Sequence, residues 1–249
     1  MNALAADWDA PEGVTAFTTL RTGGTSVGGY DSLNLGFHVG DDADRVARNR
    51  ALVRETMGWN AEPVWLDQVH STTVVRAEGP PSPTPPRADG AVTARRGLPL
   101  VVMTADCLPV LLCDRAGTVA GAFHAGWRGL LAGILENGIK AMGPPASELL
   151  VWIGPCIGPE SYQVGPEVRD AYLESSPEHG AEFVPDGPAH WKFDLAGAAV
   201  RRLNTAGVAF VTRSRWDTYR DTDLFFSHRR AAPCGRIGTF ICLEPRRAS

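Results

Sequence analysis

The stretch LPLVVMTADCLPVLLCDRAGTVAGAFHAGWRG, residues 98–129, decides the fold. Apolar and β-branched residues form three runs of strand length within it, which predict buried strands at Leu98–Met103, Val110–Cys113 and Thr118–Phe123. Polar residues interrupt the apolar sequence too often for a membrane helix, and Pro109 predicts that the hydrogen-bonded ladder ends between the first two strands. The third run leads through glycines into a predicted helix at Leu130–Met142, so strands and helices are mixed within one unit.

The rest of the chain continues this mixture. Further strands are predicted at Val14–Leu20, Pro63–Val69, Thr72–Ala77, Glu148–Ile153, Val208–Arg213, Leu224–Ser227 and Gly238–Leu243. Further helices are predicted at Asp41–Gly58 (with Asp42 as its N-cap), Val164–Ser175 and Leu195–Ala206. Five prolines within Gly79–Arg87 exclude regular structure there, but the segment is too short to link independent domains. We therefore expect one mixed α/β (α+β) domain over residues 1–249.

Composition and charge narrow the class of protein. Apolar residues make up 44% and charged residues 21% of the 249 residues, which is typical of a globular fold. The formal net charge of -4 builds no positive field for nucleic acid, and the pairs Arg229–Arg230 and Arg246–Arg247 are too small to change this. Met1–Glu12 lacks a cationic segment before an apolar run, so we expect a cytoplasmic protein without a membrane partner. Five cysteines without an export signal predict reduced thiols rather than a disulfide framework.

Three residues at the ends of predicted elements are candidates for chemistry. Cys107 lies at the break between two strands, where it either projects into a cavity or fills the core, as isolated cysteines usually do. His124 ends a strand before a glycine-rich entry into a helix, where either a functional or a structural histidine is typical. His70 lies in a polar turn and indicates little when it is taken alone. Together, two imidazoles and a thiolate suit zinc or copper, and three protein ligands leave a fourth position open, as in catalytic sites.

Two longer motifs, Thr104–Leu112 (TADCLPVLL) and Ala122–Gly129 (AFHAGWRG), closely resemble those of the YfiH-like family. Members of that family are labelled multicopper polyphenol oxidase (laccase domain) or purine nucleoside phosphorylase. The resemblance covers nearly the whole chain in order. Its further motifs are Arg21–Gly24, Ser32–Gly36, His38–Asp42, Gln68–His70, Gly154–Pro159, Tyr162–Gly165 and Phe225–Arg230.

The resemblance implies a catalytic metal, zinc or alternatively copper, on His70, Cys107 and His124. It also implies a four-layer αββα fold with two mixed β-sheets between helices, similar to a cytotoxic-factor-like hydrolase fold. The implied activities are phosphorolysis of purine nucleosides (adenosine, inosine, guanosine, methylthioadenosine) and deamination of adenosine, so a nucleoside and phosphate are the expected small-molecule partners. Some members are linked instead to phenol oxidation or to hydrolytic editing of a peptidoglycan precursor.

A phosphorylase needs groups that hold phosphate, ribose and base. Arginine suits phosphate because its forked donors engage two oxygens, and the candidates are Arg21, Arg229 and Arg230. Asn34 and Gln68 are candidates for hydrogen bonds to the ribose or the base. For each of these five residues, a role in fixing a loop is the competing interpretation.

Other polar residues carry open alternatives. Asp106, beside Cys107, is a candidate acid for deamination or a partner that fixes a histidine tautomer. Asp217 stands where many members of the family carry a cysteine, and His228 replaces the usual tyrosine before the arginine pair. His228 is therefore an additional polar or metal-adjacent candidate, whereas Cys156, in a Gly-Pro loop, is interpreted as structural first.

Three other functions compete with the phosphorylase. In a metal-free hydrolase, Cys107 would be the nucleophile and a histidine its base. Copper-dependent phenol oxidation needs more imidazole ligands than six scattered histidines without a His-x-His pair readily provide. A non-catalytic protein with a stiffening metal would need a fourth ligand, for which His228 and Cys156 are the candidates.

Overall fold

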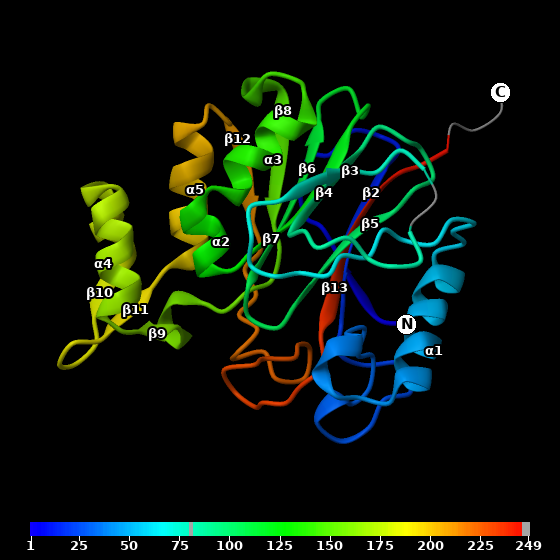
Figure 1. Ribbon diagram of the computed structural model, residues 1–249, viewed down its shortest axis with the longest axis horizontal. Helices are drawn as coiled ribbons and strands as arrows, with labels where there is room; N and C mark the ends of the chain where they lie inside the picture. The colour runs from blue at the N-terminus through cyan, green and yellow to red at the C-terminus, as the bar shows by residue number, and fades with distance from the viewer. Residues whose placement is uncertain (80–81, 246–249) are drawn as a thin grey trace.

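Two β-sheets form the centre of the computed structural model, which describes residues 1–79 and 82–245 (Figure 1). The larger sheet has the strand order β12 (Phe210–Arg213), β8 (Leu149–Ile153), β6 (Leu108–Asp114), β7 (Ala120–Ala125), β4 (Gly90–Thr93) and β3 (Val74–Arg76). The smaller has the order β1 (Ala3–Ala5), β2 (Val14–Thr19), β13 (Ile237–Leu243) and β5 (Leu100–Thr104). The larger sheet is mixed, because β12 pairs with β8 and β3 with β4 in parallel, whereas its other pairs are antiparallel.

The two sheets pack face to face through apolar side chains. Successive residues of a strand point to opposite faces, so Leu111 of β6 lies between the sheets, whereas Leu112 faces the helices. Leu100 of β5 and Ile241 of β13 complete the layer between the sheets from the other side. Burial on both faces explains why these strands appear in the sequence as continuous apolar runs rather than alternating ones.

Helices cover the outer faces of both sheets. The larger sheet is covered by α2 (Trp127–Ala132), α3 (Ile134–Met142) and α5 (Leu195–Thr205), which share its apolar cluster. The smaller sheet packs against α1 (Ala43–Thr56), whose Val53 joins Phe17 and Phe240 in a separate cluster. The four-layer αββα arrangement implied by the family resemblance is therefore confirmed.

Three of the predicted elements are wrong, and the strand β4 was not predicted. The helix predicted at Leu130–Met142 is two helices, because Gly133 adopts a left-handed φ of 104° between α2 and α3. Pro63–Val69 and Leu224–Ser227 are not strands. Most of their apolar side chains are buried, but their backbones pair with no strand over more than one residue. Val64 and Asp67 make isolated bridges to Leu100 and Arg87, and Phe225 and Phe226 fill a cluster under a turn. By contrast, Asp42 caps α1 as predicted, accepting a hydrogen bond from the Arg45 N–H.

Pro109 does not end the ladder as expected but lies inside β6, opposite His124 of β7. The His124 N–H donates to the carbonyl of Asp89, beside β4, so the Pro109–His124 pair needs no N–H from proline. The Pro109 carbonyl still accepts a hydrogen bond from the Gly154 N–H. The described part of the proline-rich segment forms no helix or named strand, while Pro80, Pro81 and the Arg246–Arg247 pair lie outside the described residues.

A small subdomain projects from one side of the sheets (Figure 1). It consists of α4 (Pro166–Ser175) and a sheet with the order β10 (Phe183–Pro185), β11 (Trp191–Phe193) and β9 (Gln163–Val164). Phe183 stacks on Phe193 with ring centroids 4.4 Å apart, and the edge of Tyr172 packs against both. Across the described part of the chain, no helix combines the length and apolarity that a bilayer crossing requires.

Close packing of α3 on the larger sheet depends on Gly138. A Cβ at this position would lie 2.5 Å from the buried ring of Phe123, so Gly138→Ala should lower the free energy of unfolding by about 1–3 kcal/mol because of overpacking. This loss should occur although alanine favours a helix over glycine by about 1 kcal/mol. Gly180→Ala is the matched control, because its Cβ would lie 3.6 Å from Leu173, an ordinary contact. Urea unfolding measures both, and an unchanged midpoint for Gly138→Ala would contradict the prediction.

Candidate metal centre

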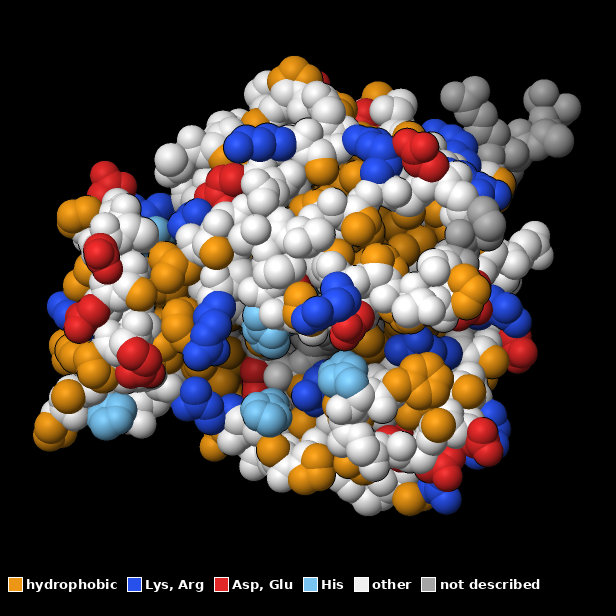
Figure 2. All heavy atoms as spheres, viewed as in Figure 1, with side chains coloured by type: hydrophobic (Ala, Val, Ile, Leu, Met, Phe, Trp, Pro, Cys, Tyr) orange, Lys and Arg blue, Asp and Glu red, His pale blue; other side chains and the backbone are white. Residues whose placement is uncertain are grey.

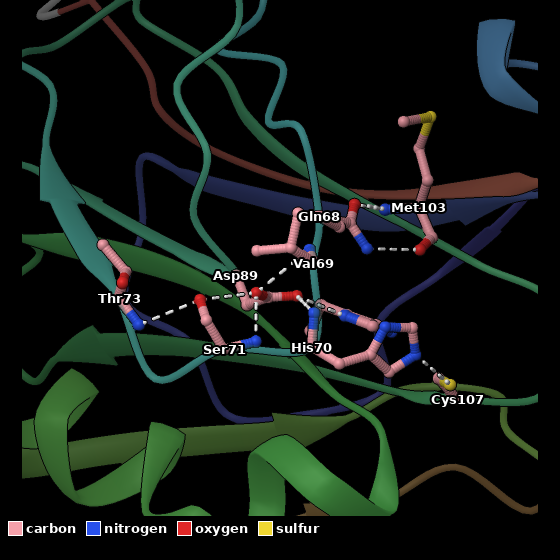
Figure 3. A network of polar contacts seen from close by, with 9 residues as sticks. Gln68, Val69, His70, Ser71, Thr73, Asp89, Met103 and Cys107 are labelled. Atoms are coloured by element: carbon pink, nitrogen blue, oxygen red, sulfur yellow. Dashed lines mark hydrogen bonds and ion pairs between the residues drawn. The ribbon is translucent and has the colours of Figure 1, made fainter.

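Three side chains that are distant in sequence meet at one end of the larger sheet. His70 comes from the loop before β3, Cys107 from the turn between β5 and β6, and His124 from β7. Their ligand atoms all lie within 4.8 Å of one another. Cys107 Sγ is 3.9 Å from His70 Nε2 (Figure 3), and the two imidazole rings are nearly perpendicular, with centroids 4.8 Å apart.

Unusual backbone conformations aim two of these side chains. His70 has a φ of 60°, and Asp106, which precedes Cys107, has a φ of 96°. Residues other than glycine rarely adopt such values, and each costs on the order of 1–3 kcal/mol unless surrounding contacts enforce it. At Asp106 the contacts are visible: its carbonyl accepts from the Ile157 N–H, and its carboxylate accepts from the Thr218 hydroxyl and the Arg229 N–H.

A buried carboxylate, that of Asp89, holds two of the three candidate ligands. It is fully buried and accepts hydrogen bonds from the N–H groups of Val69, His70 and Ser71 and from the Ser71 hydroxyl (Figure 3). Asp89 Oδ1 also lies 2.8 Å from Nδ1 of His124. Because a carboxylate can only accept, Nδ1 carries the proton and Nε2 keeps its lone pair for a metal.

The partner that fixes a histidine tautomer is therefore Asp89, and the alternative that assigned this role to Asp106 is wrong. Sequence reasoning missed Asp89, which stands alone between Ala88 and a strand and matches no short ligand motif. The one available signal is a single carboxylate before the short apolar run Ala91–Val92, where a charge needs partners; this run forms β4, which was not predicted as a strand.

The charges of the site support a thiolate ligand. Burial raises the pKa of Asp89, but hydrogen bonds from His124 and Ser71 outweigh burial and lower it to about 2. Burial likewise raises the pKa of the Cys107 thiol, but the charges and hydrogen bonds of His124 and His70 lower it to about 6. Burial lowers the pKa of His124, and the neighbouring Cys107 and Asp89 more than reverse this effect. Without metal, Cys107 and His124 thus favour a thiolate–imidazolium pair, so metal binding should release a proton.

The donor set fits a metal ion such as zinc. In tetrahedral zinc sites, Zn–S distances of about 2.3 Å and Zn–N distances of about 2.0–2.1 Å place sulfur and nitrogen about 3.5 Å apart. The 3.9 Å between Cys107 and His70 is close to that spacing. Gly126 leaves the necessary room, since a Cβ there would lie 2.8 Å from His70 Cδ2 and 3.2 Å from Cys107 Sγ. Among the described residues, the cluster includes neither His228 nor Cys156 as a fourth ligand.

Two cavities flank the triad. The polar chamber, about 360 Å³, is bordered by the triad and by His38, Gln68, Met103, Thr104, Ala105, His228 and Arg236. The aromatic chamber, about 150 Å³, is lined by Ala105, Asp106, Cys107, Trp127, Ile157, Tyr162, Leu195, His228 and Arg229. Figure 2 shows histidine side chains gathered around a hollow on this face, with arginines beside it. Because Cys107 borders both cavities, an ion at the triad would face both.

The predicted substrate residues divide into two groups. Gln68 borders the polar chamber and Arg229 the aromatic one, although the Gln68 amide also exchanges two hydrogen bonds with the backbone of Met103. The other three make structural contacts. Arg21 donates to the carbonyls of Asp31 and Thr222. Arg230 donates to three carbonyls of its own loop. The buried Asn34 forms hydrogen bonds with Gly36, Asp41 and Arg236. Residue type alone does not distinguish a guanidinium that faces a cavity from one that ties a loop.

Comparison with known proteins agrees with this architecture. A family model described as multi-copper polyphenol oxidoreductase laccase matches residues 15–244. The purine nucleoside phosphorylase PA4543 of Pseudomonas aeruginosa is 46% identical over 246 residues, covering 98% of this chain and 100% of that protein. The purine nucleoside phosphorylase YfiH of Escherichia coli is 41% identical over 240 residues, covering 96% and 98%. The chain therefore belongs to this laccase-like YfiH family, which confirms the resemblance of its motifs.

Solved structures share the fold over nearly the full length. Neisseria meningitidis protein NMB0706 superposes with a TM-score of 0.93 at 42% identity, covering 98% of this chain and 100% of that one. YlmD from Geobacillus stearothermophilus superposes with a TM-score of 0.87 at 31% identity, covering 94% and 93%. The mixed α/β fold with two stacked sheets is thus a shared property of these proteins.

The role of Asp89 is testable through metal affinity. Asp89→Asn removes the negative charge and one acceptor, so the metal affinity should fall about 10–100-fold, as for other partners of ligating histidines. Competition with a chromophoric chelator measures this change. Asp67→Asn is the control, because Asp67 lies in the same loop but is exposed and pairs only with exposed Arg87. Equal affinities for both variants and the parent would show that Asp89 does not orient His124.

Proposed function

We propose that this chain is a metal-dependent purine nucleoside phosphorylase that also deaminates adenosine. The observation that carries the proposal is the triad of His70, Cys107 and His124 with cavities on two sides, in a chain whose relatives are named purine nucleoside phosphorylase. Zinc is the proposed ion and copper the alternative, because both accept imidazole and thiolate ligands. The proposed substrates are adenosine, inosine, guanosine and methylthioadenosine with inorganic phosphate.

In phosphorolysis, a phosphate oxygen forms a bond to C1′ of the ribose as the N-glycosidic bond breaks. The bonding electrons leave with the purine, which takes up a proton, and ribose-1-phosphate is the second product. A metal on the triad would supply Lewis-acid chemistry, and in deamination, in which water replaces the 6-amino group of adenosine and ammonia leaves, it would lower the pKa of that water toward neutrality. The reaction therefore needs groups that hold phosphate, hold the base and move one proton.

The chain supplies side chains for these tasks. Asp89 keeps the His124 ring in a fixed orientation, and Gln68 and Arg229 offer donors at the edges of the two chambers. Asp106 lines the aromatic chamber beside Cys107, and each of its oxygens retains a lone pair beyond the bonds to Thr218 and Arg229. We assign it proton transfer to or from the base. His228 borders both chambers and is the second candidate for this transfer.

The description of the family favours phenol oxidation as a second candidate. Oxidases of that type use several copper ions, whereas the described residues contain one cluster of potential ligands, with three donors. Copper-dependent oxygen uptake with a phenol would reverse this ranking.

Product analysis tests the proposal directly. Incubation of the zinc-loaded protein with adenosine and phosphate should yield adenine and ribose-1-phosphate, and incubation without phosphate should yield inosine. Chromatography separates these products. If neither forms from adenosine, inosine or guanosine, the proposal fails and the peptidoglycan-precursor hydrolase becomes the better hypothesis.

Removal and restoration of the metal separate metal chemistry from a metal-free cysteine nucleophile, whereas loss of the Cys107 thiol would abolish activity in either case. A chelator should abolish turnover, and added zinc should restore it, because the ion supplies the Lewis acid. Cys107→Ser should lose both the bound metal and at least about 100-fold in activity, since a neutral hydroxyl replaces the thiolate donor. Cys156→Ser is the control, because its buried thiol bonds only the Ile157 carbonyl. Full activity of the metal-stripped parent would favour the nucleophile instead.

A further inference from the structure

The two chambers differ in chemistry, and we propose that they divide the substrates: the purine ring binds in the aromatic chamber and inorganic phosphate in the polar chamber. The assignment rests on the proposed function. It makes Tyr162 and Trp127 the residues that hold the base, and Arg236, His38 and Thr104 the residues that hold phosphate. None of these five was a candidate from the sequence.

The aromatic chamber suits a flat, mostly apolar ring. Trp127, Ile157 and Leu195 form its apolar walls, and Ile157 and Leu195 are almost fully buried. Tyr162 adds a half-buried ring, which is held from behind by Phe193, with ring centroids 5.8 Å apart. Among the described residues, nothing hydrogen-bonds to the Tyr162 hydroxyl, so it is free to bond a polar atom of the base. Stacking on aromatic side chains tolerates any purine, which agrees with a broad range of nucleosides.

The polar chamber suits a small anion. Its described lining contains no carboxylate, while Arg236 and His38 contribute cationic or donor groups. Arg236 is anchored by one terminal nitrogen, which donates to the carbonyls of Cys234 and Gly235. Its Nε and its other terminal nitrogen make no hydrogen bond to any described residue, which leaves two donor nitrogens for phosphate. Burial, and then the positive charges of Arg236 and Arg50, lower the pKa of His38, which indicates a positive local field.

A second, independent observation comes from Thr104. This residue borders the polar chamber and is only 1% exposed, yet its hydroxyl has no hydrogen-bond partner among the described residues. A buried hydroxyl without a partner costs on the order of 1–3 kcal/mol, so such groups usually bond a ligand or water. Thr104 ends β5, immediately before the turn that carries Cys107, and under the proposed division its unpartnered hydroxyl bonds the anion beside the candidate metal ligands.

The reverse arrangement is unfavourable. Phosphate in the aromatic chamber would lose its hydration against apolar walls and would face the carboxylate of Asp106. The Arg229 guanidinium there already donates to the Gln163 carbonyl and lies over the Tyr162 ring. Ala105, Cys107 and His228 border both chambers and mark their boundary. With the base on one side and phosphate on the other, the ribose and its N-glycosidic bond lie at this boundary, beside the metal ligands.

Separate Michaelis constants for the two substrates test this division. In the zinc-loaded protein, Arg236→Met should raise the KM for phosphate at least about 10-fold, the loss expected for a hydrogen bond to a charged group, and leave the KM for adenosine within about 2-fold. Arg236→Lys should restore part of the phosphate affinity. Tyr162→Leu should raise the KM for adenosine about 5–100-fold through lost stacking and leave the KM for phosphate unchanged.

Two further variants guard against misfolding and non-specific effects. Thr104→Val removes only an unpartnered hydroxyl, so this variant should fold normally. Its affinity for phosphate should still fall about 10-fold. Arg48→Met is the charge-matched control, because Arg48 is exposed on α1 and makes no hydrogen bond or ion pair with described residues. It should change neither constant.

Calorimetric titration with inorganic phosphate alone distinguishes failure of this inference from failure of the proposed function. If the parent binds phosphate, and if both Arg236→Met and Thr104→Val lower this affinity, the polar chamber is the anion site. This conclusion would hold even if the protein catalysed no phosphorolysis. If phosphorolysis occurs but neither variant alters phosphate binding or its KM, the division is wrong. If Tyr162→Leu raises the KM for phosphate instead of that for adenosine, the two chambers are assigned in reverse.

Discussion

The carboxylate of Asp89 is the contact on which the site depends. It joins the loop that carries His70 to the strand that carries His124, because it binds the backbone of one and the ring of the other. A buried charge is stable only when it is fully hydrogen-bonded, and five donors meet that requirement here. The same contacts hold an otherwise unfavourable φ at His70 and set the tautomer of His124. Local backbone geometry and metal chemistry therefore have one common cause.

The stacked sheets explain why three distant residues can meet. β5 and β6 belong to different sheets, and the turn between them carries Cys107 from one sheet to the other. The pairing of β6 with β7 then brings Gly126 beside Cys107, with space for an ion instead of a side chain. The position of the site follows from the crossing between sheets, while its reactivity follows from the charges of His124 and Cys107.

Much of this arrangement was predictable from the sequence, and there are physical reasons why the rest was not. Long apolar runs identified most core strands but not β4, helix caps and one-sided apolar patterns identified the helices, and the family motifs predicted the candidate ligands His70, Cys107 and His124. Asp89 was missed because its importance arises only when a loop folds onto it. Arg21 and Arg230 were predicted to bind phosphate because of their residue type, yet backbone carbonyls occupy their guanidinium groups. Arg236 was missed since no motif distinguishes a guanidinium with two free donors.

The projecting subdomain has an evolutionary consequence. Tyr162 lies immediately before β9, at the base of the subdomain, whereas all three candidate metal ligands come from the stacked sheets and their loops. Under the proposed division of the chambers, replacement of residues 159–195 among relatives would change the wall that faces the base and leave the three candidate metal ligands in place. If this division is correct, exchange of this segment between homologues would transfer the preference for one nucleobase over another.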